Sequence, residues 1–113
     1  MVLAITAEQQ QALARAQRRD YGRRLLPQLA ARAQEIGYPA PTEDTVDGWL
    51  SEGVAAGVER ASDLTDLCHV LMEMAWAGAR PPEASARLSD PEVGGRLKVF
   101  QVRHAWREQL ERR

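Results

Sequence analysis

Apolar residues recur at helical spacing along most of the chain, and no stretch alternates in the manner of a β-strand. The richest pattern lies in residues 45–78, which predict two helices joined by a tight connection. In the first helix, apolar and small side chains from Val46 to Ala61 fall within one half of a helical wheel. In the second, larger side chains form the core stripe: Leu64, Leu67, Val70, Leu71, Met74 and Ala75.

Local start and stop signals predict a long first helix. Thr6 and Gln9 have the capping-box form, and Gly37 suits the position just after a helix that runs to about Ile36. Pro27 lies inside this helix and lacks a backbone donor, so we expect a kink or a break near residues 23–26.

Similar signals mark the ends of the remaining helices. Thr42 or Thr45 is expected to cap the second helix, Ser62 or Thr65 the third, and Gly78 to end the third. A short helix over residues 82–88 would begin with proline, and a last helix would occupy residues 96–111. The sequence therefore predicts an all-α protein, a compact bundle of four to five helices forming one domain over residues 1–113.

The second helix carries an unusual row of small residues. Gly53, Gly57 and Ala61 recur every four residues, and two glycines inside a helix cost about 1–2 kcal/mol relative to alanine. Close approach of a neighbouring backbone would offset this cost. The alternative is that these small residues are incidental in an alanine-rich helix.

The last predicted helix has two apolar stripes, roughly 140° apart on the wheel. Val93, Leu97 and Phe100 form one stripe, and the other contains Val99, Val102, Trp106 and Leu110. A helix with two apolar faces is either enclosed within its own fold or shared with a partner. Trp76 poses a similar choice, because it falls opposite the core stripe of its helix. For Trp76 we favour packing within the chain over exposure to a partner.

Charge is spread unevenly along a chain of net charge −1. Residues 1–36 hold six arginines against three acids (+3), residues 37–95 hold three against eleven (−8), and residues 96–113 hold six basic residues against two acids (+4). The basic ends are expected to fold back onto the acidic middle. We interpret the arginines of the first helix, Arg15 to Arg24, as a solvated face or a docking surface.

The residues offer little support for catalysis or for bound cofactors. Cys68 and His69 point about 100° apart on a helix, His104 is distant, and no metal-ligand pair has suitable spacing. A Cys68–His104 dyad has nothing to orient it. We expect no enzymatic activity, no metal and no cofactor. With no internal disulfide, no signal peptide in residues 1–10 and no 18-residue apolar run, a cytoplasmic protein without membrane association is expected.

Several segments resemble a group of small helical proteins encoded in bacterial type VI secretion operons. The resemblance rests on Leu3–Gln9, on Glu52-Gly-(x3)-Gly-(x2)-Arg-Ala61 and on Arg96-Leu-Lys-Val-Phe100. The chain differs at residues 62–63 and 79–82, where the family more often carries aromatic residues. The resemblance implies an accessory protein, a co-chaperone or adaptor that binds an effector or its chaperone in the cytoplasm before loading.

We expect a protein partner to bind the last helix. Aromatic and arginine side chains favour interfaces, so the candidate surface comprises Phe100, Arg103, Trp106, Arg107 and Leu110, with Trp76 as a further candidate. A homodimer is compatible with the same features. The alternative functions are an immunity protein that blocks a toxin effector and a small nucleic-acid-binding regulator, although the acidic middle disfavours nucleic acid.

Overall fold

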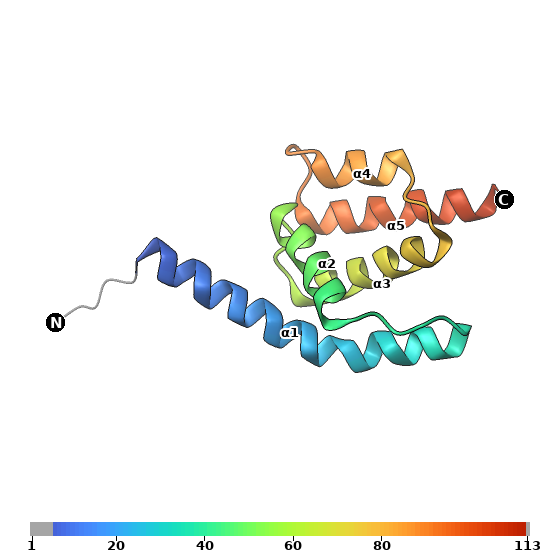
Figure 1. Ribbon diagram of the computed structural model, residues 1–113. Helices are drawn as coiled ribbons and strands as arrows, with labels where there is room; N and C mark the ends of the chain where they lie inside the picture. The colour runs from blue at the N-terminus through green and yellow to red at the C-terminus, as the bar shows by residue number, and fades with distance from the viewer. Residues whose placement is uncertain (1–5, 113) are drawn as a thin grey trace.

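Five helices and no strand make up residues 6–112, the part of the chain that the computed structural model describes (Figure 1). The all-α prediction is confirmed. The start of the chain lies outside the described residues, including Leu3–Ile5 of the resemblance and part of the segment tested for a signal peptide. The helices are α1 (Ala7–Ile36), α2 (Glu43–Ala55), α3 (Ala61–Ala77), α4 (Pro82–Ser89) and α5 (Gly95–Glu111).

Helix α1 begins and ends as predicted. The hydroxyl of Thr6 accepts from the backbone N–H of Gln9, whose side chain accepts from the N–H of Thr6. Gly37 closes the helix in a left-handed conformation, with φ of 86°. Pro27 does not break the helix, but the axis changes direction near its middle (Figure 1). Pro27 is exposed, so its ring lies away from the bundle. The first half of α1 projects beyond the other helices.

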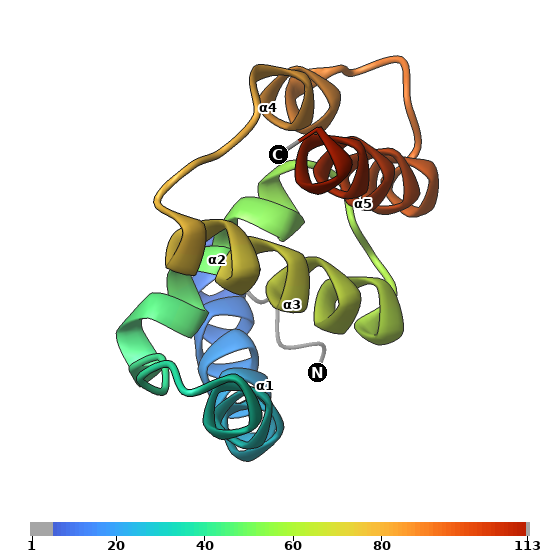
Figure 2. The same ribbon diagram turned by 90° about the vertical axis from the view of Figure 1, so that its right-hand side faces the viewer.

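Helix α3 lies at the centre of the bundle and shares its two hydrophobic clusters (Figure 2). One face of α3 packs against α5, which also packs against α4. The opposite face contributes Cys68 and Met72 to a second cluster with residues of α1 and α2. The first cluster is the larger and contains Val58, Leu67, Val70, Leu71, Met74, Ala84, Leu88, Val99, Val102 and Trp106.

The connection from α2 to α3 differs from the prediction. Helix α2, capped by Thr42, stops at Ala55, and Gly57 lies beyond it with φ of 88°, a left-handed conformation that favours glycine. The proposed row of small residues is therefore not a helix face. Only Gly53 makes the expected close approach, because a Cβ there would lie 2.7 Å from Leu64 Cδ2. The neighbour is a leucine side chain of α3 rather than a backbone.

The start of α3 also lacks the predicted side-chain cap. Arg60 occupies the N-cap position and makes no capping hydrogen bond. Thr65 lies inside the first turns, where its hydroxyl donates to the carbonyl oxygen of Ala61 at 3.0 Å. Tyr21 of α1 donates to the same oxygen at 2.8 Å. The start of α3 is thus held from α1, a contact between segments far apart in sequence.

The first turn of α5 lies directly against the end of α2. A Cβ on Gly95 would lie 2.7 Å from the Cα of Val58, and closer still to the carbonyl oxygen of Gly57. Lys98, the single lysine of the chain, is only 4% exposed, and its Nζ donates to the carbonyl oxygen of Ala56 at 2.7 Å. A cation at a helix C-terminus is stabilised by the free carbonyls and the helix dipole. Gly95 permits the close approach of α5 to the end of α2, and Lys98 caps the C-terminus of α2.

Candidate protein-binding surface on helix α5

The buried face of α5 contains one of the residues predicted to bind a partner. Trp106 is 3% exposed and packs in the larger core cluster with Val99 and Val102. Its Nε1 has no hydrogen-bond partner among the described residues. Trp106 is therefore a core residue and is not one of the exposed side chains of the predicted surface. Trp106 shares a helix face with two valines, and this is the face that meets α3.

Trp76 packs within the chain, as expected. Its ring stacks on Tyr38, which lies in the loop after α1, with ring centroids 4.8 Å apart and planes 7° from parallel. Trp76 is half-buried in this arrangement. It therefore connects the end of α3 to the loop after α1.

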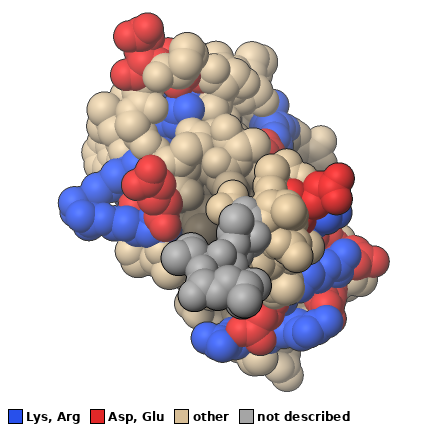
Figure 3. Space-filling model, turned by 90° about the vertical axis from the view of Figure 1, so that its left-hand side faces the viewer, with Lys and Arg blue, Asp and Glu red and all other residues tan. Residues whose placement is uncertain are grey.

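The opposite face of α5 exposes large apolar side chains. Leu97 is 52% exposed and Phe100 is 66% exposed, the largest exposed fraction among the described apolar residues of this size. Together with Gly94, Gly95 and Arg96 they line an open hollow at the start of α5. Figure 3 views the end of the molecule where α5 begins and shows charged side chains mainly around the margin of a largely uncharged face.

A second hollow lies between α3 and α5 and brings together four of the predicted residues. Its volume is about 340 Å³, and the buried ring of Trp106 forms part of its wall beside Leu110, which is 46% exposed. Arg103 lies 3.8 Å from Asp66, and Arg32 lies 3.7 Å from Glu73. The lining comprises Arg32, Asp66, His69, Val70, Glu73, Arg103, Trp106, Arg107 and Leu110.

Two residues that line the hollow at the start of α5 were not among the predicted site residues. Leu97 was recognised only as part of an apolar stripe, and Arg96 only as part of a sequence motif. Arg96 precedes Phe100 by four residues, which places both on the same side of the helix. From Gly95 to Arg107 the helix contains no acidic residue. The four-residue spacing and the absence of acidic residues were the signals in the sequence that could have identified these two residues.

The buried cysteine is unsuited to nucleophilic chemistry. Cys68 is fully buried, and this burial raises its pKa to about 12, so the thiol stays protonated at neutral pH. His104 lies exposed on α5, where its Nε2 is 3.0 Å from Glu108. His69 contacts Gln28 at 3.2 Å. Within residues 6–112, no cluster of three His, Cys, Asp or Glu side chains is placed to hold a metal ion.

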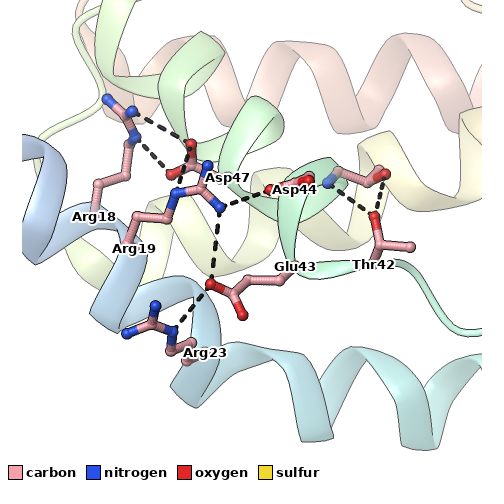
Figure 4. A network of polar contacts seen from close by, with 8 residues as sticks. Arg18, Arg19, Arg23, Thr42, Glu43, Asp44 and Asp47 are labelled. Carbon is pink, nitrogen blue, oxygen red and sulfur yellow. Dashed lines mark hydrogen bonds and ion pairs between the residues drawn. The ribbon is translucent and has the colours of Figure 1, made fainter.

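The arginines of α1 have partners within the chain, at the start of α2 (Figure 4). Arg18 Nε donates to Asp47 Oδ1 at 2.8 Å, and Arg19 Nη1 donates to Asp44 Oδ1 at 2.7 Å. Arg23 pairs in the same way with Glu43 at 3.0 Å. The first basic segment thus folds onto the acidic middle, as its charge predicted. These three arginines hold α2 in place, and the side chains of Arg19 and Arg23 remain 41% and 63% exposed, as a solvated face requires.

The Arg18–Asp47 pair gives a prediction for acid stability. The Arg18 hydrogen bond lowers the pKa of Asp47, against the opposing effect of burial. The charged carboxylate therefore stabilises the fold above the pKa of an unfolded aspartate, about 4, and this contribution is lost as pH falls through the lower, folded-state pKa. We expect Asp47→Asn to cost about 1 kcal/mol at neutral pH, and much less in acid.

Urea unfolding at neutral pH and at about pH 3 measures this difference. Asp44→Asn is the control, because the Asp44 side chain is 86% exposed and should contribute little at either pH. An Asp47→Asn variant that loses as much stability between the two pH values as the unaltered protein would contradict this role.

Comparisons of the chain with protein family models, with curated protein sequences and with solved structures found no match. None of the helices within residues 6–112 has the length and apolar content needed to cross a membrane.

Proposed function

We propose that this chain is a protein-binding accessory factor that engages its partner through the exposed side of α5. The exposure of Leu97 and Phe100 side by side on a helix whose other face is fully packed is the observation that carries this proposal. Large apolar side chains that adjoin a hollow are typical of interaction sites. Arginines on the same helix supply the second kind of anchor common in interfaces.

The resemblance to small helical proteins of type VI secretion operons supplies the biological setting of the proposal. It suggests that the partner is an effector chaperone, or the effector itself, and that binding takes place in the cytoplasm before loading. The motifs behind the resemblance include Arg96–Phe100, which forms part of the proposed surface. An immunity role fits less well, because Glu43, Asp44 and Asp47 of the acidic middle are already paired with arginines.

Co-purification of the tagged chain with the products of the genes that neighbour its own tests the proposal, the expected partner being an effector chaperone or an effector. Leu97→Asp and Phe100→Asp are expected to reduce capture of that partner at least tenfold, since each places a charge in an apolar contact worth about 1.4 kcal/mol or more. Leu13→Asp is a matched control, because Leu13 is 53% exposed but lies on the projecting half of α1.

Capture that is lost in both α5 variants and kept in Leu13→Asp supports the proposed surface. Circular dichroism must show that each variant stays helical. Undiminished capture by folded Leu97→Asp and Phe100→Asp proteins would remove α5 as the binding surface.

A further inference from the structure

Three arginines and one aromatic residue form a continuous row on the exposed side of α5. Arg96, Phe100, Arg103 and Arg107 recur at intervals of four, three and four residues, the spacing of a seam between two packed helices. We call these four residues the α5 row. At 1.5 Å per residue, its terminal arginines are separated by about 16 Å along the axis. Leu97 lies beside it at one end.

The charges of the α5 row are poorly neutralised within the chain. Neither Arg96 nor Arg107 forms an ion pair with any residue in the described part of the chain, and Arg103 approaches Asp66 only to 3.8 Å. The contrast with α1 is clear, because Arg18 and Arg19 have carboxylate partners at 2.8 and 2.7 Å. The exposed apolar pair of α5 is thus bordered by positive charge that lacks an internal partner.

We infer that the α5 row binds an acidic amphipathic helix of the partner protein, laid along α5. Carboxylates of that helix would pair with Arg96 and Arg107 near its two ends, while its apolar side chains cover Leu97 and Phe100. This inference rests on the proposed function and names the kind of partner segment that the surface accepts. The separation of Arg96 and Arg107 along α5 predicts acidic residues about three helical turns apart on the partner helix.

Charge separates this occupant from the two main alternatives. A second copy packed antiparallel along α5 would bring Arg96 of one chain close to Arg107 of the other, and like charges repel. Nucleic acid would pair with the arginines but would leave Leu97 without an apolar contact. An acidic amphipathic helix satisfies both the charged and the apolar side chains.

Two synthetic peptides provide the test. The first is a fluorescein-labelled helical peptide of about 21 residues, six turns long, with leucine on one face bordered by glutamate. The second has lysine in place of each glutamate. We expect the full chain to bind the glutamate peptide, more weakly as salt is raised, and to bind the lysine peptide at least tenfold more weakly.

Reversal of the two terminal charges should exchange these preferences. The double variant Arg96→Glu/Arg107→Glu is expected to lose at least tenfold in affinity for the glutamate peptide and to gain affinity for the lysine peptide. Arg15→Glu is the control, because Arg15 also lacks an ion pair among the described residues but lies on α1. It should change neither affinity.

Several results would overturn the inference: no binding of the glutamate peptide, equal binding of both peptides, or unchanged binding by the double variant. Sedimentation showing a dimer that Phe100→Asp dissociates would assign the surface to a second copy instead. Tight binding of duplex DNA that the double variant abolishes would assign it to nucleic acid. If peptide binding fails while Leu97→Asp still blocks capture of the native partner, the proposed function stands and the acidic helix is excluded.

Discussion

Replacement of Trp106 with alanine is expected to lower the free energy of unfolding by about 3–5 kcal/mol. The indole is 3% exposed and fills the larger core cluster between α3 and α5. Its removal leaves a cavity that the surrounding side chains fill only in part. Small domains have a total stability of about 5–15 kcal/mol, so this loss is a large fraction of the whole.

Urea unfolding followed by far-UV circular dichroism measures this loss. Phe100→Ala is the matched control, because it also truncates an aromatic residue of α5, but one that is 66% exposed. Its effect should stay within about 0.5 kcal/mol. Equal losses in the two variants would contradict the assignment of Trp106 to the core. An acidic substitution at Trp106 would report on folding, so it cannot be used to test partner binding.

Gly95→Ala is expected to destabilise the protein by about 1–3 kcal/mol or more. Helix propensity alone predicts the opposite sign, since alanine in a helix is favoured over glycine by about 1 kcal/mol. The deciding factor is the backbone of Gly57 and Val58, because a Cβ on Gly95 would lie 2.7 Å from Val58 Cα. Backbone atoms cannot rotate aside as a flexible side chain can, so the start of α5 must shift. That shift would also disturb the hydrogen bond from Lys98 to Ala56.

Gly94→Ser is the control for this variant. It adds a Cβ one residue earlier, at the N-cap of α5, where nothing lies within 4 Å, and it supplies a hydroxyl suited to capping. We expect an unchanged or slightly higher free energy of unfolding for Gly94→Ser. A Gly95→Ala protein with raised stability would show that α5 does not approach α2 this closely.

Several helix boundaries set by local chemistry were predicted correctly, although the side-chain cap expected at the start of α3 is absent. The capping box of Thr6 and Gln9, the left-handed glycines at 37 and 78, and the proline at the start of α4 each act within a few residues. Long-range charge was also informative, since the basic first segment does pair with the acids at the start of α2. A block of like charges was enough to predict that these two segments meet, although the individual ion pairs were not predicted.

The end of α2 was mispredicted because Gly53 and Gly57 look alike in sequence. Both lie on the apolar half of the helical wheel, four residues apart. In the structure, Gly53 is inside the helix against Leu64, whereas Gly57 is outside it with positive φ. No local signal distinguishes the two positions. The packing positions of α3 and α5 decide which glycine lies inside α2 and which lies beyond its end.

The candidate surface was predicted only in part for the same reason. The pattern of α5 revealed two apolar stripes and its arginines, which follow from side-chain chemistry and a period of 3.6 residues. It could not tell which stripe meets α3, and so Trp106 and Phe100 were assigned to one surface. Burial of a stripe depends on the position of a neighbouring helix, which is set by the whole core. Local sequence therefore accounts for the helices and for the two faces of α5, and the packing of α3 and α4 leaves Phe100, not Trp106, exposed to solvent.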